Sequence, residues 1–311
     1  MPLVSHAAIL LDEVARYGSI RRAAARMNVS ASAVNRQILN LEAELGVALF
    51  ERLPKGMRPT AAGEAILVEV RQWRRAQIRV RTHLQELKGL RRGHVAVGMM
   101  ECFGRDLGPR VFRDIRQRHP RITLQALVGG TDFIADQLSA GHLDVAIAFS
   151  MPVRPGIKTI FSISVPVAVA VAPGHPLAKR KWTSLGDCVG YPIVMPDSSL
   201  AFRDLIENAL TQSRDSLLAS VTANSIEFIK GSLQDQHHIS LLTWLDVHGE
   251  VANKTLRFVP LRPAEMLYQK LFISVPARAK NSSLTMLVAG FFQAEIEQAV
   301  RSSIKAPIEA K

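Results

Sequence analysis

The feature that most constrains the fold of this chain is the segment from Ser19 to Gly63, which has the pattern of a helix-turn-helix followed by a basic wing. Residues 19–27 are predicted to form a short helix, residues 28–30 a turn, and residues 31–45 a longer second helix. A helix presented in this way fits the major groove of double-stranded DNA. An ordinary helical hairpin with a solvated polar face has the same local pattern, and stays an alternative at this point.

The ends of these two helices carry residues suited to helix caps. Ser30 is a plausible N-cap of the second helix, because its oxygen can accept hydrogen bonds from the free amides of the first turn. Asn28 suits the left-handed position that ends the preceding helix. Both residues therefore place the turn between the helices.

The second helix separates into two faces when its residues are placed about 100° apart. The apolar face consists of Val34, Ile38, Leu41 and Leu45. We expect this stripe to pack on the preceding helices. Ser32, Asn35 and Arg36 fall on the opposite side, near the N-terminus. Asparagine pairs well with adenine, and arginine pairs with guanine or with phosphate.

The second helix is followed by a basic turn, which could flank a groove and touch backbone phosphates. Gly56 permits a tight turn, and Arg52, Lys55 and Arg58 surround it. Thr60 is placed to cap the next helix. The residues predicted to contact DNA are Arg22, Ser30, Ala31, Ser32, Asn35, Arg36, Arg52, Lys55 and Arg58.

Nearly all of residues 5–67 resemble the DNA-binding domain of the LysR-type transcriptional regulators. The resemblance is carried by residues 18–24, 29–38, 41–42, 45–46, 49–52 and 60–63. It implies a DNA-reading role, and Arg36 keeps the family residue. The family usually has Gln-Pro at Ala31-Ser32 and Ser or Thr at Asn35, so the familiar base preferences do not carry over.

Composition and charge agree with a DNA-binding protein of two or three domains. The chain has 311 residues, 48% of them hydrophobic, and a net charge of +12. Residues 1–93 hold 16 Lys and Arg against 8 Asp and Glu, and residues 94–311 hold 23 against 19. The excess of positive charge alone would also fit RNA or an acidic membrane. The geometry of the helices favours DNA.

The sequence predicts a cytoplasmic protein with no membrane partner. The N-terminus has no charged leader before an apolar core, and no run reaches the ~18 apolar residues of a membrane span. Two cysteines, Cys102 and Cys188, do not make a disulfide framework.

A long helix over residues 61–90 is predicted to mediate dimerisation. Its apolar positions follow a heptad pattern, interrupted by Gln77. The seam consists of Ile66, Val70, Trp73, Val80, Leu84 and Leu87. The alternative is packing on its own domain, but in the resembled family this linker helix forms the dimer contact. A homodimer, or a homotetramer built from it, would recognise an interrupted two-fold-related DNA site.

From His94 onward, strands alternate with helices in βαβ order, which predicts a parallel sheet with helices outside. The expected fold is α/β, with domains at 1–60, 61–90 and 91–311. Within the last domain, we expect lobe I at about 91–163 and 267–302 and lobe II at about 164–266, with a cleft between them. The LysR-type effector domain, which is similar to periplasmic (type 2) solute-binding proteins, has this architecture.

The resemblance implies that a small-molecule effector binds in the cleft. The residues predicted to bind it are Met100, Glu101, Cys102, Thr131, Asp132, Phe149, Ser198, Ser199, Phe202 and Asn224. The first wall usually carries a hydroxyl, whereas this chain has Met100 beside Glu101. We hypothesise that Glu101 and Asp132 select an effector with a positive or hydrogen-bond-donating group. Alternatively, both acids are solvated or neutralised by Arg105 and nearby bases.

These patterns indicate a transcriptional regulator rather than an enzyme. The sequence has no nucleophile elbow, phosphate-cradling loop or His-Glu-x-x-His pair, and we expect no cofactor and no metal. A thiol-based redox sensor using Cys102 is an alternative, and a solute-binding module without ligand-dependent regulation is another. The resemblance implies that effector binding changes how paired DNA-binding heads sit, and hence how RNA polymerase is recruited.

Overall fold

Three capped helices open the chain in the computed structural model, which describes residues 4–54, 56–87, 93–198, 200, 203–213, 219–262, 267–277 and 282–305. They are α1 (His6–Tyr17), α2 (Ile20–Met27) and α3 (Ala31–Leu45). A serine hydroxyl accepts from a first-turn amide at the start of each helix, and a left-handed residue follows each end. The predicted bounds of α3, its Ser30 cap and the left-handed Asn28 are confirmed.

The wing follows as a two-stranded antiparallel hairpin of β1 (Phe50–Leu53) and β2 (Gly56–Pro59). Helix α4 (Ala61–Leu87) comes next, and the Thr60 hydroxyl accepts from the Gly63 amide at 3.0 Å, as the sequence predicts. Lys55, at the tip of the wing, lies outside the described residues.

The N-terminal helices, the wing and α4 form one unit, residues 1–87, and residues 88–311 form a second. The first half of α4 belongs to the core of the first unit, because Leu67 and Val70 are buried there with Leu11 and Val14 of α1. Arg74 of α4 also pairs with Asp12 and Glu13 of α1. The predicted separation of a 1–60 domain from a 61–90 helix is therefore not seen in the packing.

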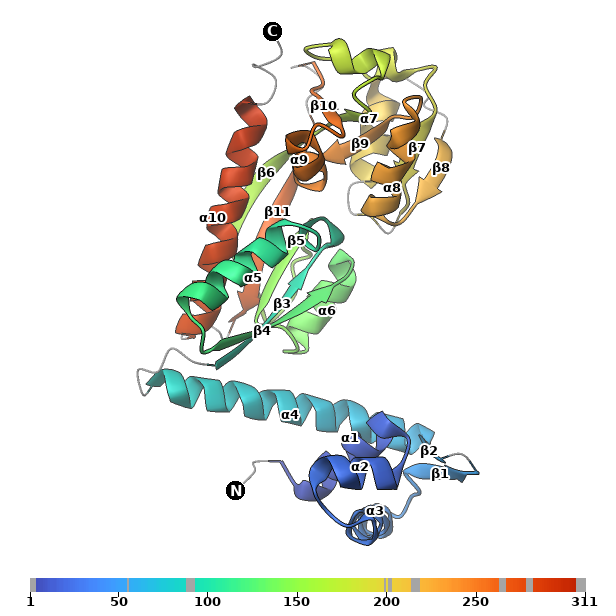
Figure 1. Ribbon diagram of the computed structural model, residues 1–311, viewed down its shortest axis with the longest axis vertical. Helices are drawn as coiled ribbons and strands as arrows, with labels where there is room; N and C mark the ends of the chain where they lie inside the picture. The colour runs from blue at the N-terminus through green and yellow to red at the C-terminus, as the bar shows by residue number, and fades with distance from the viewer. Residues whose placement is uncertain are drawn as a thin grey trace. The chain divides into compact units, whose positions relative to one another are not determined.

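The second unit is built on a seven-stranded sheet (Figure 1). Strands β3 (Gly93–Met99), β4 (Ile122–Val128) and β5 (Val145–Phe149) are parallel. Strand β11 (Leu267–Pro276) runs antiparallel to β5 and to β6 (Ile157–Val171). The expectation of a parallel sheet is wrong in this part, because two long strands cross between the lobes and pair in opposite directions.

Strand β6 continues the sheet into the second half of the unit. Strands β9 (Ser240–Thr243) and β10 (Arg257–Val259) both pair with it antiparallel. A separate parallel pair is formed by β7 (Ile193–Pro196) and β8 (Ala219–Ala223). The first part of β6 alternates polar and apolar residues and is only partly buried, whereas its last residues are buried.

Two hydrophobic cores define the lobes, and the helices complete them. Lobe I holds α5 (Leu107–Arg118), α6 (Thr131–Ser139) and α10 (Ser283–Lys305) with β3 to β5. Lobe II holds α7 (Arg203–Ser213) and α8 (Ile226–Ser232) with β7 and β8.

The core residues change from lobe I to lobe II between Val165 and Val167, at the crossing strand β6. Helix α9 (Trp244–Ala252) contributes to both cores, because Trp244 and Leu245 pack in lobe I and Val247 packs in lobe II.

Candidate functional site

The exposed face of α3 carries polar groups, as its pattern predicts. Val34 and Ile38 are buried against α1 and α2, whereas Ser32 and Arg36 are exposed on the other side. Leu45 is 47% exposed, so its predicted place in the buried stripe is wrong. Leu45 is the last residue of α3, and the left-handed Gly46 follows it.

A hydrogen bond joins this face to the wing. Arg52 Nη2 in β1 donates to Asn35 Oδ1 in α3 at 2.9 Å. Arginine has no acceptor, so the Asn35 oxygen must face Arg52, which leaves the amide nitrogen free to point elsewhere. Bidentate pairing of Asn35 with adenine uses the same oxygen, so this oxygen would have to accept from adenine in addition to Arg52 or in its place.

The wing is fixed by its backbone and carries a paired charge. Met57 N donates to Gly18 O at 2.9 Å, and Gly56 has a φ of 143°. A side chain at Gly56 would lie 2.5 Å from Gly18 O, so the close approach requires glycine. Arg58 pairs with Glu51 at 2.7 Å, and both side chains are exposed. Such surface pairs are weak, and Arg58 can exchange Glu51 for a phosphate.

The predicted dimer seam on α4 has two parts. Its residues before Trp73 pack in the core of their own unit, whereas those described from Trp73 onward are exposed. Ile66 is half-buried and Val70 is 1% exposed in the core of their own unit, so Val70 is not available to a partner helix. Trp73, Val80 and Leu84 are exposed by 52%, 46% and 52%. The side chain of Leu87 lies outside the described residues.

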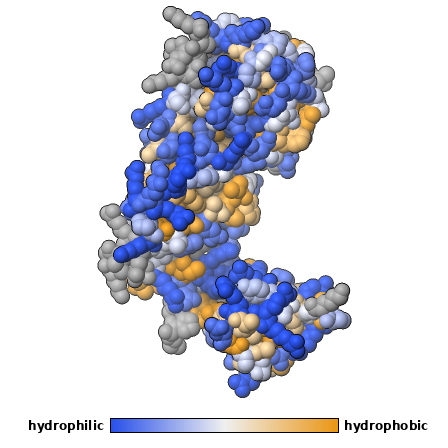
Figure 2. All heavy atoms as spheres, viewed as in Figure 1, coloured by the Kyte–Doolittle hydropathy of each residue, from blue (hydrophilic) through white to orange (hydrophobic). Residues whose placement is uncertain are grey.

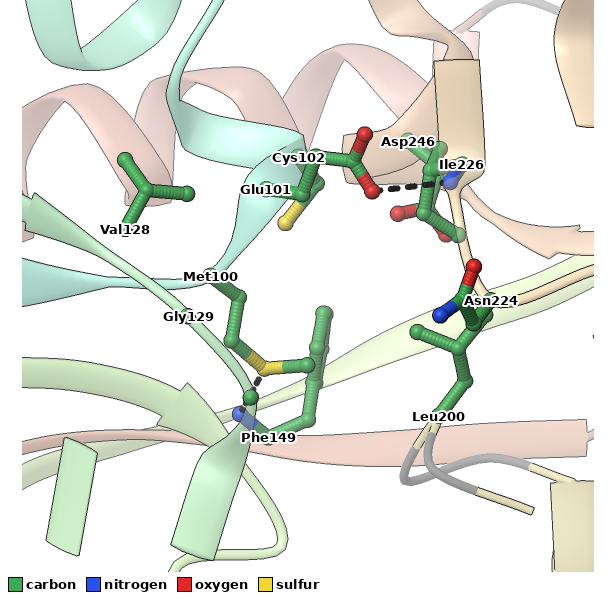
Figure 3. Close-up of a pocket in the computed structure, with 11 residues that line it drawn as sticks. Met100, Glu101, Cys102, Val128, Gly129, Phe149, Leu200, Asn224, Ile226 and Asp246 are labelled. Carbon is green, nitrogen blue, oxygen red and sulfur yellow. Dashed lines mark hydrogen bonds between the residues drawn. The ribbon is translucent and has the colours of Figure 1, made fainter. Parts of the chain in front are cut away.

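A cavity of about 440 Å³ opens between the two lobes of the second unit. Its described lining is mostly apolar, and the side chains that surround it come from both cores (Figure 3). The lining consists of Met100, Glu101, Cys102, Val128, Gly129, Gly130, Phe149, Leu200, Asn224, Ile226 and Asp246.

Glu101 connects the two lobes at the edge of this cavity. Its Oε1 accepts from Ser225 Oγ at 2.8 Å, and its Oε2 accepts from the Ile226 amide at 2.9 Å (Figure 3). Glu101 thus lies at the first turn of α8, where free amides attract an anion. One alternative from the sequence was that Arg105 neutralises Glu101. In the structure, Arg105 pairs instead with Glu227 and Glu250.

Two other titratable groups line the cavity. Burial raises the pKa of the Asp246 carboxyl to about 6, although hydrogen bonds from Thr243 act in the opposite direction. Burial also raises the pKa of the Cys102 thiol well above its ordinary value, and the negative charge of Asp246 adds to this effect. The thiol is therefore protonated near neutral pH, which disfavours the redox alternative, since the thiolate is the reactive form.

Several residues predicted to bind an effector do not face the cavity. Thr131 Oγ1 donates to Phe149 O at 2.9 Å and lies outside the described lining. The side chain of Asp132 is 85% exposed and pairs with Arg154 at 3.3 Å. Asp132 is therefore not among the described residues that line the cavity, and nothing in the structure supports its predicted role in selecting an effector.

The remaining predicted positions follow β7. Ser198 is exposed and is not part of the cavity lining, whereas Ser199 and Phe202 lie outside the described residues. Met100, Glu101, Cys102, Phe149 and Asn224 are brought together as predicted.

Comparisons with known proteins identify both units. Residues 6–64 match the family described as bacterial regulatory helix-turn-helix protein, lysR family, and residues 88–297 match the LysR substrate binding domain. The chain belongs to the LysR family. It is therefore a DNA-binding transcriptional regulator with an effector-binding domain, in a family that is not enzymatic.

Individual relatives of this LysR-family regulator span most of its length. The HTH-type transcriptional activator CmpR of Synechocystis sp. is 25% identical over 83% of this chain and 86% of its own. The HTH-type transcriptional regulator CbbR of Xanthobacter flavus is 28% identical over 88% of this chain and 81% of its own. Full-length CbnR, solved with its target DNA, has the same fold, with a TM-score of 0.67, 19% identity, and coverage of 94% of this chain and 98% of CbnR.

Asp246 lines the cavity of this LysR-family regulator but was not among the residues predicted from the sequence. One local signal was present, because Thr243 and Asp246 form a capping box that begins α9. That pattern would have predicted a helix directly after β9, with its first turn at the strand end. Its position beside Cys102 and Ile226 follows only from the packing of α9 between the lobes.

Proposed function

We propose that this regulator binds double-stranded DNA as a homodimer or a homotetramer, and that a small-molecule effector in the interlobe cavity controls that binding. The contact made by Glu101 carries the effector half of the proposal. Glu101 of lobe I holds Ser225 and Ile226 of lobe II beside the cavity. A ligand there acts on the contact between the lobes, and can favour one lobe arrangement over another.

The exposed part of α4 supports self-association. Trp73, Ile78, Val80 and Leu84 are large apolar side chains, each at least 46% exposed. Figure 2 shows a largely hydrophilic surface in which hydrophobic residues gather in separate patches. A second copy of α4 would bury these side chains, and a homodimer would present two α3 helices to an interrupted two-fold-related site.

The relatives supply the biological context of the proposal. CmpR and CbbR are named as transcriptional regulators, and CbnR is solved with target DNA. By analogy, the regulator would act in the cytoplasm and would influence RNA polymerase at its target promoters. Its action would be binding rather than turnover.

The DNA half of the proposal is tested by capture of genomic fragments with the purified full-length chain. We expect enrichment of fragments that share an interrupted two-fold-related sequence. Arg36→Ala should abolish this enrichment without loss of fold, because Arg36 is exposed on the polar face of α3. Enrichment by the variant equal to that by the unaltered chain would refute the assigned reading face.

The effector half needs a cavity-blocking variant. Asn224 lines the cavity and is exposed, so Asn224→Trp should fill the space without disturbing either core. We expect the variant to bind the captured operator but to lose any change in affinity that a cell metabolite extract produces with the unaltered chain. A response of the variant equal to that of the unaltered chain would show that the effector binds elsewhere.

A further inference from the structure

The charged groups where the lobes meet are unevenly balanced. Arg105 and Lys230 are paired with Glu227 and Glu250 in one cluster, at distances of 2.7–3.0 Å. Two further acids, Glu101 and Asp246, line the cavity beside this cluster. No Lys, Arg or His occurs in the cavity lining over the residues that the structure describes. The cavity is therefore bordered by an excess of negative charge.

The position that would attract an anion is already occupied. At the first turn of α8, the Ile226 amide donates to Glu101 Oε2, and the Ser225 hydroxyl donates to Glu101 Oε1. A carboxylate ligand would have to displace Glu101 and would then lie close to its negative charge. The geometry thus disfavours an anion at the site where the protein's own anion is bound.

Asp246 carries a carboxyl group that could pair with a positively charged ligand. Its side chain is buried, with the residue 5% exposed, and Oδ2 accepts both from the Thr243 amide at 2.8 Å and from the Thr243 hydroxyl at 2.6 Å. Among the described residues, no hydrogen bond reaches Oδ1. Lys230 exerts the main favourable charge on Asp246, but the ammonium itself is held by Glu227 and Glu250.

Most of the other lining residues are apolar and shape the space for the ligand, and Asn224 adds one polar amide. Met100, Val128, Phe149, Leu200 and Ile226 surround the space that the carboxyl of Asp246 borders (Figure 3). A bare metal ion would find too few ligands, because the described residues contain no group of three or more His, Cys, Asp or Glu placed to hold one. The lining instead suits an apolar body joined to one charged group.

We propose that the cavity binds a small organic cation, an ammonium group on an apolar body, with the Asp246 carboxylate as its counter-ion. This inference rests on the proposed function, because it names the chemical class of the effector for the same cavity. It replaces Asp132 with Asp246 as the selecting acid and leaves Glu101 as the contact between the lobes.

Three probes of the same shape test the charge preference. Cyclohexylmethylamine, cyclohexylmethanol and cyclohexanecarboxylate would be titrated calorimetrically into the full-length chain at neutral pH. We expect the amine to bind at least about tenfold more tightly than the alcohol, and the carboxylate to bind most weakly. Tighter binding of the carboxylate or the alcohol, or no binding of the amine at millimolar concentration, would overturn the inference.

Two variants test whether Asp246 causes the preference for the amine. Asp246→Asn keeps an acceptor for Thr243 and removes the charge, so amine affinity should fall about tenfold while alcohol affinity stays the same. Asp132→Asn is the matched control, because its exposed carboxyl lies outside the lining, and it should leave all three affinities unchanged. Equal amine binding by Asp246→Asn and the unaltered chain would overturn the assignment.

The outcomes separate this inference from the proposed function. Binding of the carboxylate alone would refute the cation while leaving an effector cavity. The operator response of Asn224→Trp is measured without any of the three probes and decides the proposed function by itself. The ranking of the probes on the unaltered chain is decisive even if Asp246→Asn folds poorly.

Discussion

The buried carboxyl of Asp246 makes a quantitative prediction about stability and pH. Burial raises the pKa of Asp246 from 3.8 to about 6. The folded state therefore holds the proton more tightly than the unfolded state. The contribution of Asp246 to stability is fully present below about pH 4 and is lost as pH rises through about 6.

The size of this loss follows from the difference between the two pKa values. A difference of about two pKa units corresponds to about 3 kcal/mol of unfolding free energy, of which about half falls between about pH 5 and pH 8. Asp246→Asn cannot titrate, so its stability relative to the unaltered chain should rise by about 1 to 2 kcal/mol over that range. An Asn at position 246 would accept the hydrogen bonds from Thr243 less strongly, which lowers the unfolding free energy of the variant. Because this loss does not depend on pH, it does not affect the change in relative stability between the two pH values.

Urea unfolding of both chains, at several values between about pH 5 and pH 8, measures this change. Tryptophan fluorescence reports on the site, because Trp244 begins α9 and its buried Nε1 donates to Ala299 O at 2.6 Å. Asp132→Asn, which removes an exposed carboxyl, should run parallel to the unaltered chain. If the unfolding free energies of Asp246→Asn and the unaltered chain also changed in parallel with pH, the claim that burial raises the pKa of Asp246 would be refuted.

Three further predictions concern the N-terminal unit. Arg52→Ala frees the Asn35 oxygen, so selection from a random DNA library should show a changed base preference at one position of each half-site, beyond a uniform loss of affinity. Ile38→Ala should lower the unfolding free energy by about 2–4 kcal/mol, whereas Leu45→Ala should change it by less than about 1 kcal/mol in the same denaturation experiment, because only Ile38 is buried. Trp73→Glu places a charge on the exposed part of α4 and should raise the dimer dissociation constant at least about tenfold in analytical ultracentrifugation; an unchanged constant would exclude this face as the interface.

The N-terminal unit could be predicted almost completely from the sequence. Ser30, Asn28 and the spacing of Val34 and Ile38 are local signals, and each acts within one or two turns of helix. The prediction failed at Leu45, the last residue of α3, which continues the periodicity but is 47% exposed. Periodicity shows which face of a helix is apolar, and does not show how far a neighbouring element extends.

The cavity was predicted less completely, because its residues depend on contacts between distant segments. Met100 directly follows β3 and Phe149 ends β5 of the same sheet, so βαβ order alone places them together. Asp132 follows the same logic but points outward and pairs with Arg154, since its side chain lies on the exposed side of the first turn of α6. The strand-end rule identifies the edge of the sheet without choosing which side chains face inward.

The sequence by itself determined the DNA-binding head, the alternation of strands and helices and the family, because caps, periodicities and motifs are local patterns of side chains. The tertiary structure alone decided how the charges of the cavity are used. Glu101 accepts from Ser225, a residue 124 positions away, and Asp246 lies on a helix that packs in both cores. Whether a carboxyl is bonded, paired or left facing a cavity depends on such long-range neighbours, which set its desolvation and its hydrogen bonds.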